Sequence, residues 1–146
     1  MTIALSGKEV ARRVAEQIPD SIVDSDDTNI VVRSDNLFQI AQFLKTTPGF
    51  DFDYLTGVTA VDYLDYFEVV YHLTSLKHNH GLVLKTRCHE RDNPTIPSVV
   101  SLWRGADLQE REIYDLMGIS FSGHPNLRRI LLWEEFQGHP LRRDYL

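Results

Sequence analysis

The sequence is poor in cysteine, and Cys88 is its only thiol among 146 residues. One thiol forms no disulfide within the chain, and iron–sulfur clusters and thiolate zinc sites need several cysteine ligands. The sequence therefore offers no cluster site of its own, and its cysteine usage is typical of proteins made in the cytosol. We expect Cys88 to be a small buried residue in a strand rather than a reactive thiol.

Long apolar runs are also missing. No stretch approaches the roughly 18 apolar residues that a membrane-spanning helix needs, and residues 1–6 show no signal-peptide pattern. We therefore expect no direct membrane insertion, so that if the protein lies at a membrane, partner proteins hold it there. Acidic residues outnumber basic ones by 21 to 15, giving a formal net charge of −6. This balance argues against nucleic acid as a partner and against an anionic lipid surface.

Recognisable catalytic and nucleotide-binding motifs are lacking as well. The sequence has no glycine-rich phosphate loop and no Gly-x-Ser-x-Gly nucleophile elbow. Six histidines leave one metal hypothesis open, because His72, His78, His80 and His89 could meet at one end of a hairpin and bind zinc. No helical histidine pair supports that site. We therefore favour ordinary surface histidines, and we assign no catalytic, cofactor-binding or metal-binding residue.

The composition is that of a globular protein, with 42% hydrophobic and 25% charged residues and no linker or low-complexity segment. We predict one domain over residues 1–146, with a core over 1–119 and an extended tail over 120–146. Helical and strand-like segments alternate irregularly through the core. This order predicts an α+β, two-layer domain, with helices packed on one face of a mixed, largely antiparallel sheet.

Two amphipathic helices are predicted in the first third of the chain. Ser6 and Glu9 form a capping-box pattern at the start of the first, which ends before residues 19–20. Ser34 or Asp35 can cap the second, which ends before residues 47–49. Their apolar faces are predicted to be Val10, Val14 and Ile18 in the first helix, and Leu37, Ile40, Ala41 and Leu44 in the second.

Strands are predicted where apolar and polar residues alternate. The predicted ranges are 21–23, 29–33, 54–61, 67–76 and 82–89. Short polar connections over 62–65 and 77–81 indicate antiparallel hairpins between the last three. The Asn-Pro and Ile-Pro pairs at 93–94 and 96–97 are expected to break the chain after them.

A third helix is predicted to follow, and it carries several carboxylates. Asp107 is expected to cap it, with Glu110 completing a capping box, and Gly118 is expected to end it in the left-handed conformation. Arg111 and Asp115 are four residues apart and can pair on one face.

The tail is rich in residue types that protein interfaces favour. Two arginine pairs, 128–129 and 142–143, each follow a Gly-His-Pro turn and flank Trp133 and Phe136. We predict that this tail docks on a partner. A competing interpretation is that Arg128 and Arg143 pair internally with carboxylates of the third helix. Two other classes are a small histidine-dependent metalloenzyme and a free-standing acidic interaction module.

Residues 110–119, 121–131 and 133–145 closely resemble the signature of the C subunit of NADH–quinone oxidoreductase (complex I), the thirty-kilodalton subunit family. The resemblance is one of layout over residues 52–89 and is not diagnostic over 1–50. It implies a partner interface that includes these residues of the signature: Glu110, Arg111, Glu112, Asp115, Gly118, His124, Pro125, Arg128, Arg129, Trp133, Gly138, His139, Pro140, Arg142, Arg143 and Asp144.

The resemblance also implies a role. A member of this family is a non-redox scaffold in the peripheral arm of a proton-translocating complex, docked to the quinone-site partner, the forty-nine-kilodalton (D) subunit. The chain alone would not be catalytic, and FMN and iron–sulfur clusters would lie in other subunits. Partner subunits would hold it on the cytoplasmic side of the cell membrane or an equivalent energy-transducing membrane. Ferredoxin-, F420- and hydrogenase-linked relatives use an equivalent subunit, so the electron donor stays open.

Overall fold

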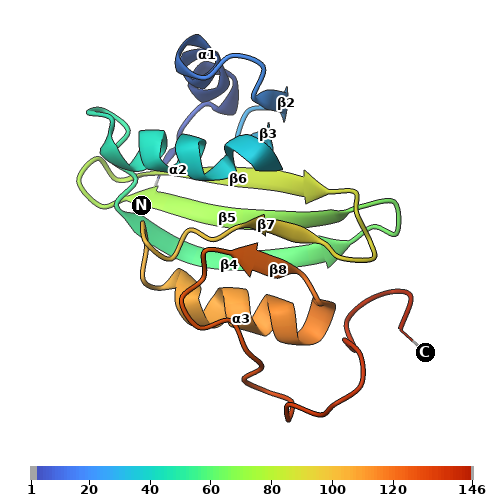
Figure 1. The fold of residues 1–146 in the computed structure, drawn as a ribbon. Coiled ribbons are helices and arrows are strands. Elements are labelled where there is room, and N and C mark those ends of the chain that lie inside the picture. The colour runs from blue at the N-terminus through green and yellow to red at the C-terminus, as the bar shows by residue number, and fades with distance from the viewer. Residues whose placement is uncertain (1–2, 146) are drawn as a thin grey trace.

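The computed structural model describes residues 3–145, which build a mixed, largely antiparallel sheet (Figure 1). The order across it is β2-β3-β6-β5-β4, with β1 paired to β6. The β3–β6 and β1–β6 pairs are parallel, and the β2–β3, β4–β5 and β5–β6 pairs are antiparallel, as the predicted hairpins require. The strands are β1 (Ile3–Ala4), β2 (Ile22–Ser25), β3 (Asn29–Arg33), β4 (Tyr54–Asp62), β5 (Phe67–Ser75) and β6 (His80–Cys88).

One face of this sheet holds the core. The alternation in β5 turns Phe67, Val69 and Tyr71 to the same face, where all three are fully buried. The helices α1 (Gly7–Gln17), α2 (Leu37–Thr46) and α3 (Ala106–Met117) contribute to the same apolar cluster. Cys88 ends β6 and is buried, as predicted. The predicted α+β layering is therefore confirmed.

A small parallel ribbon lies between α2 and α3 on that face (Figure 1). It pairs β7 (Thr95–Pro97) with β8 (Ser120–Ser122) and buries Ile96 and Phe121 in the core. The expectation that residues 96–97 only break the chain was wrong. A proline is tolerated in β7 because the strand pairs on one side only.

The helix starts depart from prediction more than the helix ends. Ser6 Oγ accepts the Glu9 N–H at 3.4 Å, so the first cap is confirmed. Ser34 and Asp35 instead form a 3₁₀ turn, η1 (Ser34–Asn36), that runs into α2 without a side-chain cap. The predicted cap on α2 was wrong because the backbone of the preceding turn leads directly into the helix.

The first turn of α3 is likewise satisfied by backbone groups rather than by a side-chain cap. The N–H groups of Ala106 and Asp107 donate to the carbonyls of Trp103 and Arg104. Asp107 therefore lies inside the first turn and caps nothing, so the predicted capping box was wrong. Gly118 does end the helix at φ 76°, with its N–H bonded to the Tyr114 carbonyl, which confirms the left-handed C-cap.

The opposite face of the sheet carries the alternate residues of β5, which include Glu68 and Val70. Glu68 is nearly buried there and pairs with Arg87 at 3.1 Å and Lys85 at 3.7 Å. Among residues 3–145, no helix has both the length and the apolar character needed to span a bilayer.

Candidate protein-interaction site

Residues 123–145 carry no helix or strand. The middle of this segment runs along α3 on its side away from the sheet (Figure 1), and its end lies beside the end of β4. An irregular segment of this length needs side chains to satisfy its backbone. Two buried carboxylates of the core, Asp115 and Asp62, supply part of that support.

The first support is Asp115, which is fully buried in α3. Its Oδ2 accepts three successive backbone N–H groups, from Ile130 at 3.2 Å, Leu131 at 2.7 Å and Leu132 at 3.0 Å. Arg129 Nη1 lies 3.1 Å from Oδ1. Burial by itself raises the pKa of Asp115, but the three N–H groups and Arg129 together hold the pKa below its usual range. The charged form of Asp115 therefore holds the backbone of residues 130–132 against α3.

The second support is Asp62, at the end of β4. Arg91 binds both oxygens of Asp62, at 2.7 and 2.9 Å, and the Arg143 N–H donates to Oδ2 at 2.8 Å. Arg91 also reaches Asp144 at 3.0 Å, and Arg142 holds the other oxygen of Asp144 at 2.9 Å. The bond to Arg91 holds the pKa of Asp62 far below its usual range, and Arg142 and then Arg91 lower the pKa of Asp144 to about 2.

Asp62 and Arg91 were missed by sequence reasoning. They lie outside the stretches that carry the family resemblance, in connections that read as ordinary polar turns. Only the tertiary structure brings them beside the end of the tail.

Arg111 supports the tail from the exposed side of α3. Its Nε donates to the Arg128 carbonyl at 3.1 Å and its Nη2 to the Arg129 carbonyl at 3.4 Å. The expected Arg111–Asp115 pair does not form because the tail lies between them and takes both side chains.

His139 binds the tail to the end of α3. Its Nδ1 lies 2.9 Å from the Asp115 carbonyl oxygen, and the Leu141 N–H donates to the Leu116 carbonyl at 2.8 Å. A Cβ atom at Gly118 would lie 2.7 Å from His139 Cδ2. The glycine is therefore needed twice, for its backbone conformation and for the approach of the tail.

Glu110 also faces inward, but its partners differ. It accepts Ser98 Oγ at 2.6 Å and the Val99 N–H at 2.9 Å, and no basic side chain among residues 3–145 binds it. Burial raises the pKa of Glu110 above its ordinary value. Nearby, His124 Nε2 lies 3.2 Å from the Asp107 backbone carbonyl oxygen, so this histidine holds the start of the tail against α3.

The arginine pairs divide between inside and outside. Arg129 and Arg142 bind carboxylates, whereas the side chains of Arg128 and Arg143 are exposed and have no partner within the described chain. The interpretation that Arg128 and Arg143 pair with carboxylates of the third helix was therefore wrong. Arg129 makes such a pair with Asp115 instead, and Arg142 pairs with Asp144 of the tail.

Apolar side chains are exposed on the same segment. Leu131, Trp133 and Leu141 are 61%, 65% and 60% exposed. Trp133 packs edge-to-face on Phe136 with ring centroids 5.1 Å apart. We call the exposed set Arg128, Leu131, Trp133, Leu141 and Arg143 the tail surface. Exposed tryptophan, leucine and unpaired arginine are residue types suited to a protein partner, and here they lie on one segment that the core holds in place.

The predicted interface residues therefore separate into two groups. Exposed ones are Glu112, Pro125, Arg128, Trp133, Gly138 and Arg143. Those that bind within the chain or lie partly covered are Glu110, Arg111, Asp115, Gly118, His124, Arg129, His139, Pro140, Arg142 and Asp144.

Two of the four histidines of the zinc hypothesis, His78 and His80, stack on each other but bond to other groups. His78 Nε2 lies 2.7 Å from Asp51 Oδ2, and His80 Nε2 lies 2.8 Å from the Phe50 carbonyl oxygen. Within residues 3–145, no three His, Cys, Asp or Glu side chains are grouped so as to hold a metal ion.

Known proteins share both the sequence and the fold. The family described as "Respiratory-chain NADH dehydrogenase, 30 Kd subunit" matches residues 30–146. The NADH-quinone oxidoreductase C subunit of Roseiflexus castenholzii is 41% identical over 149 residues, covering 97% of this chain and 85% of the relative. The C subunit of Coxiella burnetii is 36% identical over 167 residues, covering 91% and 73%.

A solved structure has a similar fold. A chain of the membrane-bound sulfane sulfur reductase, an archaeal respiratory membrane complex, superposes with a TM-score of 0.75 at 22% identity, covering 94% of this chain and 84% of that one. At that identity the likeness is one of fold alone. The family match and the closer relatives carry the assignment, and the chain belongs to the thirty-kilodalton subunit family of the respiratory-chain NADH dehydrogenase.

Proposed function

We propose that this chain is a non-redox scaffold subunit in the peripheral arm of a proton-translocating NADH-quinone oxidoreductase. In this proposal the tail surface docks on the quinone-site partner, the homologue of the forty-nine-kilodalton (D) subunit. The observation that carries the proposal is the contrast within the tail, where Arg129 and Arg142 are bound inside while Arg128, Arg143 and Trp133 are exposed. A segment built for its own domain alone has no use for that exposed set.

The physical reason for pinning the tail is preorganisation. Asp115 and Asp62 hold the backbone before any partner arrives, so less conformational entropy is lost on docking. Trp133 then supplies apolar area, and the two free guanidinium groups supply bidentate contacts to carboxylates of the partner.

The scaffold role also assigns the cofactors. The single cysteine is buried at the end of β6, and FMN and iron–sulfur clusters belong to other subunits in this proposal. The protein is held at the cytoplasmic side of the membrane through its partners. The purified chain is expected to absorb only through its aromatic residues, and a stoichiometric flavin or cluster band in folded protein would contradict the assignment.

The docking claim is tested by co-purification. A tagged chain expressed in its own organism is recovered with the complex, and the molar ratio of the forty-nine-kilodalton homologue to the tagged chain is measured. Trp133→Ala should weaken docking by about 2 kcal/mol, a roughly thirtyfold loss of affinity, if Trp133 is an interface hot spot. Leu76→Ala is the matched control, because Leu76 is 68% exposed in the β5–β6 turn.

The arginines receive a separate test. Reversing both charges with Arg128→Glu and Arg143→Glu should release the protein from the complex while the melting temperature of the isolated chain stays within about 2 °C, as for other exposed substitutions. Lys8→Glu, on the exposed side of α1, is the control. A large loss of melting temperature would mean that the two arginines serve the fold. The electron-input subunits that co-purify with the wild-type chain identify the donor.

A further inference from the structure

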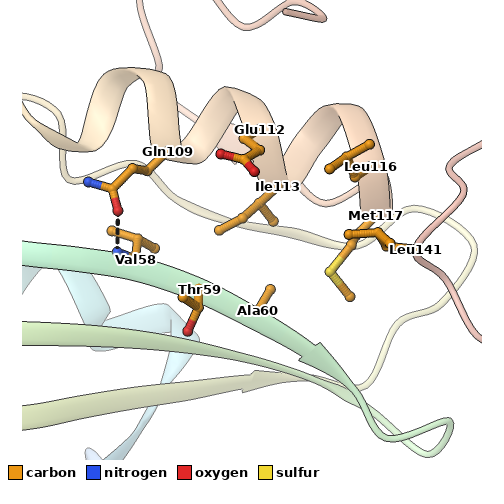
Figure 2. Close-up of a pocket in the computed structure, with 9 residues that line it drawn as sticks. All are labelled: Val58, Thr59, Ala60, Gln109, Glu112, Ile113, Leu116, Met117 and Leu141. Atoms are coloured by element: carbon orange, nitrogen blue, oxygen red, sulfur yellow. Dashed lines mark hydrogen bonds between the residues drawn. The ribbon is translucent and has the colours of Figure 1, made fainter. Parts of the chain in front are cut away.

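A slot of about 350 Å³ opens between β4 and α3 (Figure 2). Apolar side chains and one strand backbone make up most of its walls. The lining residues are Val58, Thr59 and Ala60 from β4, Gln109, Glu112, Ile113, Leu116 and Met117 from α3, and Leu141 from the tail.

The strand side of the slot is a free sheet edge. β4 is the last strand in the sheet order, so no strand among residues 3–145 pairs with its outer side. Val58 turns its N–H outward, where it donates to Gln109 Oε1 at 2.6 Å. Strand geometry repeats every two residues, so Ala60 also turns its N–H and carbonyl outward. Nothing in the described part of the chain bonds them.

Gln109 indicates what this edge accepts. Its amide oxygen occupies the place that a carbonyl of a neighbouring strand would take opposite Val58 (Figure 2). One side chain satisfies one position and leaves the next, Ala60, open beside the slot. An added strand is the ligand that supplies both a donor and an acceptor at that spacing.

The helix side of the slot narrows the choice of ligand. Ile113, Leu116 and Met117 offer an apolar wall, whereas Glu112 on the same helix is exposed and has no ion-pair or hydrogen-bond partner for its side chain among residues 3–145. An apolar side chain next to a lysine or arginine satisfies both features. Leu141 belongs to the slot and to the tail surface, so one partner can cover the two without a gap.

We propose that an extended segment of the neighbouring subunit adds to the β4 edge at Ala60. It places an aliphatic or methionine side chain in the slot and a basic side chain against Glu112. This inference rests on the proposed function, because it names a second contact of the same docking event. It predicts a strand contributed by the partner, which the tail surface alone does not require.

The decisive variants are Ala60→Pro and Glu112→Lys. Proline removes the outward N–H of Ala60 and leaves the β4–β5 ladder, whose bonds at this point are made by Thr59. Asp27→Lys is the matched charge control, because Asp27 is exposed in the turn at the opposite edge of the sheet. Each tagged variant competes with untagged wild-type chain for incorporation into the complex, measured by mass spectrometry.

We expect Ala60→Pro and Glu112→Lys to be incorporated about tenfold less than wild type, and Asp27→Lys to be incorporated equally, since a lost hydrogen bond or ion pair of this kind changes affinity by about a factor of ten. A second measurement uses the unmodified chain. The Ala60 amide should exchange with deuterium at least about tenfold more slowly in the purified complex than in the isolated protein.

The outcomes separate the two proposals. If Trp133→Ala releases the protein from the complex while Ala60 exchanges equally fast in both states, the strand-addition inference is overturned and the tail docking stands. If neither site affects incorporation, the proposed function fails with it. An isolated chain that dimerises, and whose dimer is lost with Ala60→Pro, would mean that the edge pairs with a second copy, which also overturns the inference.

Discussion

Replacing Asp115 with asparagine should loosen the middle of the tail without unfolding the core. The carboxylate accepts three backbone N–H groups and the Arg129 guanidinium, all in a site closed to solvent. Asparagine keeps the volume but loses the charge and turns a donor toward these donors. Breaking a buried pair of this kind costs about 3–5 kcal/mol. The cost falls on the contact between α3 and the tail, because the tail contributes no strand to the main sheet.

Hydrogen exchange measures this directly. If the closed state of residues 130–132 loses about 3–5 kcal/mol of stability, exchange of their amides should become faster by a factor of about 10² to 5 × 10³. Amides of β5 and β6 should keep their protection. Glu112→Gln, on the same helix but exposed and unpaired in the described chain, should change neither set. Unchanged protection at residues 130–132 in the Asp115→Asn variant would refute the conclusion that this carboxylate holds the tail.

Three further predictions concern stability. Gly118→Val should lower the stability measured by thermal unfolding by at least about 2 kcal/mol, because φ is 76° there and a Cβ atom would lie 2.7 Å from His139. Gly105→Ala is the control and should change stability little, because the space around Gly105 is open. Glu110→Gln should lower the free energy of unfolding in urea at pH 7 by no more than about 1 kcal/mol. Burial raises the pKa of Glu110, so its charged form opposes folding increasingly as pH rises. A loss as large as that of Asp115→Asn would show that the charge of Glu110 is needed. The pKa of Asp62 in the folded protein lies far below its value in the unfolded chain. Its contribution to the free energy of unfolding is therefore present above about pH 4 and is lost as pH falls toward the folded-state pKa. Acid unfolding followed by circular dichroism should be less steep in Asp62→Asn, and identical curves would count against the Arg91 pairing.

The sequence was most informative where one short-range pattern decides the outcome. Alternation of apolar and polar residues predicted the strand over 67–76, and its apolar residues Phe67, Val69 and Tyr71 lie on the buried face of β5. The 3.6-residue period likewise predicted the apolar sides of α1 and α2. Gly118 was predictable for the same reason, because a left-handed C-cap is a local requirement. Long, specific stretches of the tail indicated the family, and the family match over residues 30–146 confirmed it.

Sequence reasoning failed where a backbone group could choose between partners. Asp107 has the residue type and spacing of a cap, yet the carbonyls of Trp103 and Arg104 satisfy the first turn of α3 instead. Ile96 reads as part of a proline-broken loop, but a partner strand more than twenty positions away makes it part of the core.

The roles of the tail residues were decided by tertiary structure alone. Sequence identified Arg128, Arg129, Asp115 and Arg143 as one set, because residue type and spacing are the same for an internal ion pair and for a docking contact. The path of the tail along α3 turns Arg129 toward Asp115 and leaves Arg128 in solvent. Asp62, 81 positions before Arg143, binds its backbone through a contact that no local pattern encodes. Composition and periodicity thus determined the fold class, and long-range packing determined which charges hold the chain and which remain free for a partner.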